Sequence, residues 1–176
     1  MIRPAVFALA VFALMPLPLL AQPPCLALGG QIALCAADSP WAQARAIPLG
    51  DDFVAYEAAP FYLEASTAWI TPAEAGTPDA ALAAFEATMA ADSAAEGVPL
   101  PVRRVRDTIV TDHATIVYDI FVEVDEGEEF PIAVMVLDDG DGWLTLFLSS
   151  DAPMDGAAFE EETRSLAGLL RPEPEG

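Results

Sequence analysis

Between residues 102 and 148 the chain alternates apolar and polar positions in four runs that are separated by acidic turns. An alternation with a period of two is typical of strands with one buried face, and short acidic and glycine-containing turns join antiparallel neighbours. We therefore expect strands over residues 102–110, 114–124, 130–137 and 143–148. In chain order they form an antiparallel meander.

The two faces of this meander follow from the alternation of side chains along each strand. In the second strand, Ile116, Tyr118, Ile120 and Val122 share one face. Hairpin pairing is expected to place beside them Ile132, Val134, Val136, Leu144, Leu146 and Leu148. The opposite face then carries Val117, Phe121, Met135, Trp143 and Phe147 among the polar residues His113, Thr115 and Asp119. A sheet with apolar residues on both faces needs cover on both sides.

Two helices are predicted to supply this cover. The first begins after Thr77, a good N-cap that precedes Pro78, and stops at Gly97. Its apolar stripe consists of Leu82, Phe85 and Met89 on an alanine background.

The second helix begins near Asp155 and ends at Arg171, before Pro172. Its apolar residues are Phe159, Leu166, Leu169 and Leu170. Upstream of the first helix, residues 53–56 and 61–65 are expected to form two further strands around Ala59-Pro60. The predicted fold class is therefore α+β, an antiparallel meander flanked by helices.

The first 21 residues have the layout of a secretory signal peptide, with a positive charge at Arg3 and an apolar run over residues 5–15. Pro16 and Pro18 interrupt that run before it is long enough to cross a membrane as a helix. We expect cleavage after Ala21, with an uncleaved anchor as the alternative. Residues 22–171 then form a single domain, and residues 172–176 a disordered tail.

Cys25 and Cys35, the two cysteines of the chain, flank two short apolar arms around Gly29-Gly30. A turn centred on Gly30 places the two cysteines opposite each other, so we predict a disulfide across an N-terminal hairpin. A redox or metal pair is the alternative. Nine intervening residues differ from the CxxC spacing, and His113 as the sole histidine leaves a zinc site short of ligands.

Charge narrows the range of partners. The chain has 28 acidic and 7 basic residues and a formal net charge of −21. Such a surface repels nucleic acid and anionic membranes, and it leaves basic proteins and cations as electrostatic partners. Solubility alone is the other explanation of the charge, since the acidic residues are scattered along the chain.

The order of these elements is similar to that of the PsbP-like and DcrB-like α/β proteins. The residues that carry the resemblance are the Pro40-Trp41 turn, the stretch Trp143-Leu-Thr-Leu-Phe-Leu-Ser-Ser, Phe159 and Ser165-Leu166. The resemblance implies an antiparallel sheet flanked by helices in a protein of the bacterial envelope or thylakoid lumen. It also implies binding or assisting other proteins without catalysis, and it brings no catalytic residues to carry over.

Candidate chemistry is sparse. None of the serines lies in a GxSxG elbow, and His113, beside Asp112, is the sole imidazole that could act as a base. We expect no catalysis and no cofactor. Asp138, Asp139 and Asp141 could hold a calcium ion, although Asp- and Gly-rich sequences are also what hairpin turns require.

Two sets of side chains are candidates for binding. Arg103, Arg104 and Arg106 gather positive charge and could contact a partner or an anion, with Arg104 and Arg106 on one strand face. Pairing with carboxylates of the chain itself is the alternative. Met135, Trp143 and Phe147 could line a pocket for a small ligand, or else belong to the core.

These features favour a non-catalytic periplasmic or secreted protein that acts through contact with an envelope protein of unknown identity, or in envelope assembly. We expect no nucleic acid as a partner and no stable membrane insertion after cleavage. The alternative is a periplasmic protein that binds a small ligand or Ca²⁺.

Overall fold

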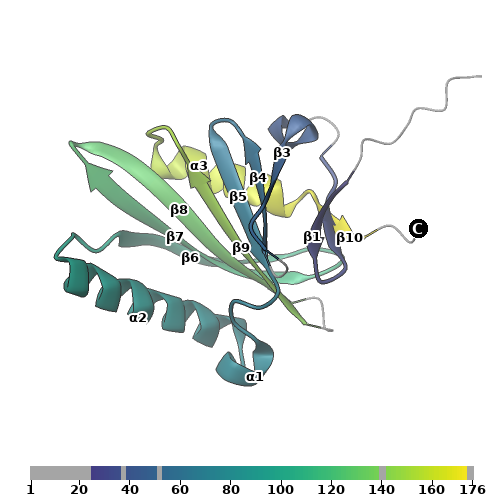
Figure 1. The fold of residues 1–176 in the computed structure, drawn as a ribbon, viewed down its shortest axis with the longest axis horizontal. Coiled ribbons are helices and arrows are strands. Elements are labelled where there is room, and N and C mark those ends of the chain that lie inside the picture. The colour runs from purple at the N-terminus through teal and green to yellow at the C-terminus, as the bar shows by residue number, and fades with distance from the viewer. Residues whose placement is uncertain (1–24, 37–38, 51–52, 139–141, 174–176) are drawn as a thin grey trace, which may run out of the picture.

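The computed structural model describes residues 25–36, 39–50, 53–138 and 142–173, and the predicted signal peptide lies outside them. The fold class is α+β with mostly antiparallel strands, as the alternation predicts (Figure 1). Among the described residues no helix is both long and apolar enough to cross a membrane.

The larger sheet has seven strands, and every neighbouring pair is antiparallel. Its strand order is β3-β4-β5-β9-β8-β7-β6. The strands are β3 (Arg45–Pro48), β4 (Phe53–Ala58), β5 (Phe61–Ser66), β6 (Val102–Val110), β7 (Thr115–Asp125), β8 (Glu128–Asp138) and β9 (Trp143–Ser150). All four strands of the predicted meander are present, and β3 is an addition that the proline-containing sequence did not suggest.

A smaller sheet joins the two ends of the described chain. Its order is β1-β2-β10, with β1 (Leu26–Gly29), β2 (Ile32–Leu34) and β10 (Leu170–Pro172). The helices are the 3-10 helix η1 (Pro40–Gln43), the short α1 (Pro72–Ala75), α2 (Pro78–Glu96) and α3 (Gly156–Ala167). In α2, Thr77 caps the start and Gly97 ends the helix in the left-handed conformation, as predicted.

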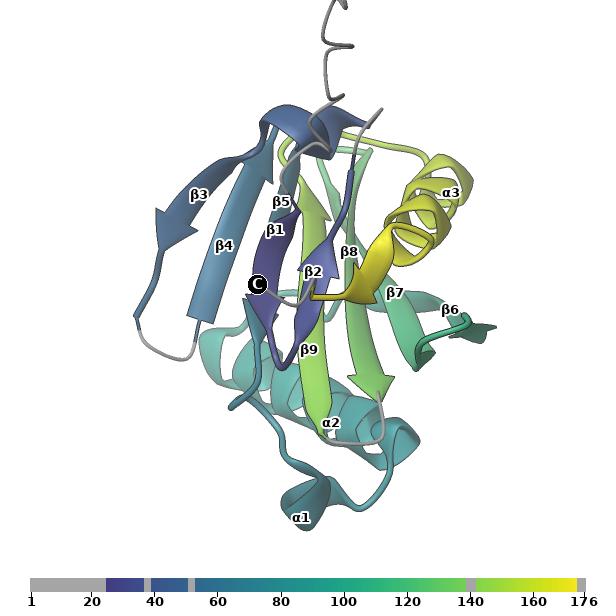
Figure 2. The same ribbon diagram turned by 90° about the vertical axis from the view of Figure 1, so that its right-hand side faces the viewer.

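The elements form three layers. Helix α2 lies on one face of the large sheet, whereas α3 and the small sheet lie on the other (Figures 1 and 2). The main core fills the space under α3 and the small sheet, where Leu34, Tyr118, Met135, Phe159 and Leu166 are buried. A second core lies under α2 and contains Leu82, Val117, Phe121, Val134, Val136 and Trp143.

The predicted register between β7 and β8 was wrong. Tyr118 lies opposite Met135 and Ile120 opposite Ala133, so Met135 belongs to the main core. Val134 and Val136 lie instead on the α2 face. The turn places Asp125 opposite Glu128, and this fixes the register; β8 is apolar on both faces, so its sequence accepts either assignment.

The predicted end of the second helix was also wrong. Helix α3 ends at Ala167, and Leu170–Pro172 form strand β10 against β2. The Glu173 N–H then donates to the Gln31 carbonyl at 2.7 Å. Pro172 and Glu173 therefore belong to the ordered domain and not to a tail, because β2 offers backbone groups that pair with them; residues 174–176 lie outside the described residues.

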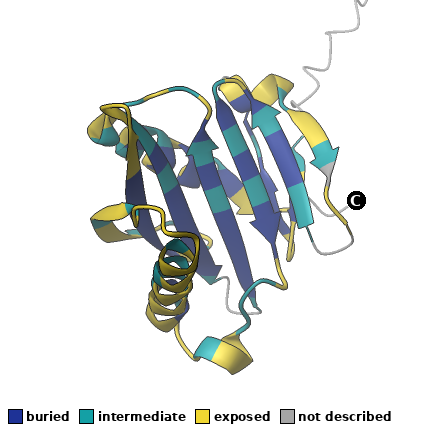
Figure 3. Ribbon diagram, turned by 60° about the vertical axis from the view of Figure 1, so that its left-hand side comes forward, coloured by how far each residue is buried: buried dark blue, intermediate teal, exposed yellow. Residues whose placement is uncertain are grey.

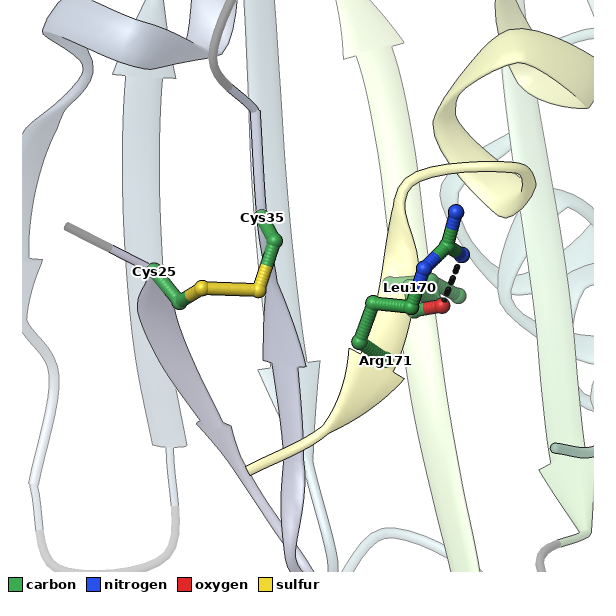
Figure 4. Close-up of a disulfide and its surroundings, with 4 residues drawn as sticks. All are labelled: Cys25, Cys35, Leu170 and Arg171. Carbon is green, nitrogen blue, oxygen red and sulfur yellow. Dashed lines mark hydrogen bonds between the residues drawn. A yellow bond between two sulfur atoms is a disulfide. The ribbon is translucent and has the colours of Figure 1, made fainter. Parts of the chain in front are cut away.

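The predicted disulfide between Cys25 and Cys35 is present, with Cα atoms 4.2 Å apart (Figure 4). It closes the hairpin in which Leu26 pairs with Leu34. The turn rests on the loop after β5, because a Cβ atom at Gly30 would lie 3.3 Å from the Thr67 methyl group. Strand β2 is the middle strand of the small sheet, so the disulfide holds the strand that also binds β10.

Removing this cross-link is expected to destabilise the small sheet first. For a loop of 10 residues, chain entropy predicts that the variant C25S/C35S loses about 2 to 3 kcal/mol of unfolding free energy. Urea unfolding measures the loss, and amide exchange should quicken in β2 and β10 before β7 and β8. A reductant should leave C25S/C35S unchanged; equal stability of the wild type and this variant would contradict the prediction.

Helix α3 is also tied to the edge strand β6. The Arg164 guanidinium lies 2.6 Å from Asp107 of β6 and 3.0 Å from Glu160 of its own helix. The pKa of Asp107 is lowered, first by the hydrogen bond from the Thr108 N–H and then by the one from Arg164. The folded state therefore stabilises the charged form of this carboxylate.

This lowered pKa gives a pH dependence of known sign. The stabilisation is present above the ordinary pKa of 3.8 and disappears as the pH falls through the lower pKa of the folded state. The stability difference between wild type and D107N should therefore be constant near neutral pH and shrink below about pH 4. Urea midpoints from pH 2 to 7 measure it, and parallel profiles for the two proteins would show that Asp107 has no such role.

Candidate functional site

Helix α2 covers only part of its face of the large sheet. Its principal contacts are with β7 and β8, and only Ala81 and Leu82 of the helix are fully buried. The helix lies to one side of the sheet, and the neighbouring strands beside it carry bands of half-buried residues (Figure 3). Beside the helix, the strands β8, β9 and β5 carry half-buried side chains on this face of the sheet.

We call this surface the open face and define it by Tyr62, Glu64, Ile132, Phe147 and Ser149. Cross-strand pairing places them together: Glu64 lies opposite Phe147, and Ser149 lies between Tyr62 and Ile132. Each of the five is half-buried. The open face is therefore an apolar and aromatic patch with one carboxylate, held on three adjacent strands.

An aromatic cluster forms the border between α2 and the open face. The ring of Trp69 lies 4.9 Å from that of Phe147 and 5.1 Å from that of Phe85 in α2. The Phe85 ring lies 5.7 Å from Phe147 and 5.8 Å from the buried Phe121. Edge contacts of this kind fix ring positions, so Phe147 is presented by a rigid support.

The electrostatics of the open face are acidic. Burial and, second, the nearby Glu64 carboxylate raise the pKa of Tyr62, so its hydroxyl stays protonated. Glu57, opposite Tyr62, is paired with Arg45 at 2.5 Å. Glu64 has no arginine within salt-bridge distance in the part of the chain that the structure describes. Its charge is therefore available to a partner.

The three candidate arginines do not form one surface. A β-bulge between Arg103 and Val105 places Arg103 and Arg106 on the α2 face, opposite Phe121 and Asp119. Arg104 instead reaches Glu129, at 3.4 Å. The prediction that Arg104 and Arg106 share a face was wrong, because the bulge adds a residue and shifts the alternation.

Arg103 and Arg106 bind the carboxylate of Asp119, which is completely buried in the middle of β7. Arg106 donates two hydrogen bonds to it, at 2.7 and 2.5 Å, and these bonds raise the pKa of the guanidinium. Arg103 lies 3.9 Å from the same carboxylate and 2.6 Å from Glu86 of α2. The arginines thus join β6, β7 and α2.

Asp119 is the carboxylate that Arg103 and Arg106 share, and its position among apolar residues of the predicted sheet did not by itself indicate this role. The signal was a carboxylate inside an apolar strand, since a buried charge requires a partner. Three arginines in the preceding strand were the obvious partners.

The pocket proposed around Met135, Trp143 and Phe147 does not form as one site. Trp143 and Phe147 lie on the α2 face, whereas Met135 is buried on the opposite face. Trp143 is only 7% exposed, so Phe147 is the member of the set that reaches the surface. The register of β8 accounts for the separation.

The acidic turn lies partly outside the described residues. Asp138 ends β8 and is half-buried, but Asp139 and Asp141 are not described. Within residues 25–36, 39–50, 53–138 and 142–173, no three His, Cys, Asp or Glu side chains are grouped closely enough to hold a metal ion. His113 lies exposed in the turn between β6 and β7.

The Arg106–Asp119 pair is expected to matter more for stability than its neighbours. In R106Q the buried carboxylate loses its main partner, which should cost about 3 kcal/mol of unfolding free energy. The matched control is R104Q, whose ion pair is half-exposed and worth at most about 1 kcal/mol. Urea unfolding at neutral pH measures both variants, and equal losses would contradict the central position given to Asp119.

No protein-family model and no curated protein matches the chain. Solved structures with a similar arrangement include the Ran-binding protein Mog1p of Saccharomyces cerevisiae, at 9% identity and a TM-score of 0.47, over 81% of this chain and 90% of that one. Another is LpqN of Mycobacterium tuberculosis, described as involved in cell envelope biogenesis, at 14% identity and a TM-score of 0.43, over 81% and 83%. A protein of Bacteroides thetaiotaomicron has 11% identity and a TM-score of 0.46, over 83% of this chain but only 46% of its own. These likenesses concern the arrangement of helices and strands alone.

Proposed function

We propose that this protein is exported to the periplasm, or secreted, and acts without catalysis by binding an envelope protein or assisting envelope assembly through its open face. The proposal rests on the difference in how completely the two faces of the large sheet are covered. One face is closed by α3 and the small sheet, whereas the other is covered mainly by α2 and leaves Tyr62, Ile132 and Phe147 only half-buried.

The residue types of the open face suit protein contact. Aromatic side chains are enriched in the centres of protein interfaces because they bury a large area at a small cost in conformational entropy. Tyr62 and Phe147 stand on the sheet, and Trp69 supports Phe147 from the side. A rigid support reduces the entropy that binding would otherwise cost.

Charge indicates the kind of partner. The net charge of −21 and the available carboxylate of Glu64 favour a partner surface with lysine or arginine around an apolar centre. Long-range attraction speeds the association of such a pair and weakens with salt. A basic partner segment could place an ammonium or guanidinium group on Glu64 and its apolar part on Phe147.

The location is supported by the leader and the cysteines. Residues 1–21 have the signal-peptide layout, and the Cys25–Cys35 disulfide is of a kind that persists in oxidising compartments. The resemblance to PsbP-like and DcrB-like proteins agrees with this proposal.

Substitutions on the open face should abolish partner capture. We expect Y62A and E64R each to reduce the main protein captured from the envelope fraction by about tenfold or more, measured by quantitative mass spectrometry. Both residues are half-buried, so Y62A loses some packing area, and melting curves should show that each variant is still folded at the capture temperature.

The matched control is E161R, the same charge reversal at an exposed position of α3 on the opposite side of the sheet. It should capture the partner as the wild type does. Equal capture by E64R, Y62A and the wild type would refute the open face as the binding surface, and a loss in E161R as large as in E64R would show that net charge alone determines capture.

A further inference from the structure

We propose that a cavity between the β6–β7 turn and the connection from α3 to β10 binds a small molecule that carries both a carboxylate and an ammonium group. The cavity is open to solvent, has a volume of about 310 Å³ and is lined by the half-buried Thr111 and the exposed residues Asp112, His113, Gly168 and Arg171. This volume lies at the lower end of the range for ligand pockets and suits a molecule of amino-acid size. The site is remote from the open face, and the inference does not rest on the proposed function.

One wall of the cavity is a rigid turn. The Thr111 hydroxyl accepts hydrogen bonds from the N–H groups of His113 and Ala114, at 3.2 and 3.0 Å. It also donates to the Ala114 carbonyl at 3.1 Å, and the Thr111 N–H donates to the same carbonyl at 3.0 Å. These bonds hold the backbone that carries Asp112 and His113 in a defined position.

The other wall is held by the small sheet. Arg171 lies opposite Ala33 of β2, and the Cys35 N–H donates to the Leu169 carbonyl at 3.0 Å. Figure 4 shows the Arg171 side chain beside the connection from α3, on the side of β10 away from the disulfide. Residues 111–113, from the middle of the sequence, therefore line one cavity together with Gly168 and Arg171 from its C-terminal part.

Arg171 differs from every other described arginine. The guanidinium groups of Arg45, Arg103, Arg104, Arg106 and Arg164 each contact a carboxylate. Within the described residues Arg171 contacts none, and its Nη1 donates to the Leu170 carbonyl at 2.6 Å. Its remaining N–H groups keep the planar fork that binds a carboxylate.

Asp112 adds a negative charge to the cavity that already holds the positive charge of Arg171. Asp112 lines the same space, is exposed, and has no ion-pair partner among the residues described. An ammonium group can therefore bind Asp112 while a carboxylate on the same molecule binds Arg171, and His113 offers a ring nitrogen for a further hydrogen bond. Asp112 would repel a ligand that carries only a negative charge, and Arg171 would repel one that carries only a positive charge. A ligand with both charges therefore fits best.

The test is a titration of the ¹⁵N-labelled, disulfide-bonded protein with glycine, followed by NMR. We expect saturable shifts confined to the amides of residues 111–114 and 168–171. Acetate and methylammonium, which carry one charge each, should bind at least about tenfold more weakly than glycine. R171Q and D112N should each weaken glycine binding by about tenfold or more, since each removes one charged hydrogen-bond partner.

The matched control is R45Q, an arginine at the far edge of the sheet, which should bind glycine as the wild type does. Spectra of the unliganded variants show whether each one is folded. The proposal is overturned if glycine causes no saturable shift at tens of millimolar, if R171Q or D112N binds glycine like the wild type, or if acetate binds as tightly as glycine.

Discussion

The large sheet carries apolar side chains on both faces, so both faces must be covered, and this requirement determines where the helices and the small sheet lie. The main core is closed by α3 together with a small sheet that requires both ends of the described chain. The other face has one long helix. A helix is about 10 Å wide and strands lie about 4.8 Å apart, so one helix covers about two strands. Helix α2 packs on β7 and on part of β8, so β9, β5 and the part of β8 around Ile132 form the open face.

Positive charge in this protein serves mainly to hold the layers together. Asp119 is buried in β7, and Arg106 and Arg103 from the neighbouring strand neutralise it, while Glu86 extends the same network to α2. Arg164 ties α3 to β6 in a similar way. Five of the described arginines are therefore paired with carboxylates of the chain, and Arg171 is the exception among the described residues. The net charge of −21 favours partners with basic surfaces.

Local patterns predicted the elements better than their pairing. The strands of the meander, the caps of α2 and the Cys25–Cys35 disulfide follow from residues close in sequence. The face of Met135 does not, because a strand that is apolar on both sides carries no signal for its own register. The bulge between Arg103 and Val105 puts Arg103, and not Arg104, on the same face as Arg106. Strand β10 forms because β2, which is far away in the sequence, offers it a partner. The open face could not be foreseen, since it depends on where α2 lies across the sheet.

Hydroxyl-radical footprinting can show whether the open face is the surface that binds the partner. It reports the side-chain accessibility of Tyr62, Trp69 and Phe147 in the purified protein and again in the presence of the envelope fraction. We expect all three to be labelled in the purified protein and protected by the envelope fraction, while the buried Tyr118 and Met135 stay unlabelled throughout. If these side chains are already protected in the purified protein, or if the envelope fraction leaves their labelling unchanged, the open face is not the binding surface.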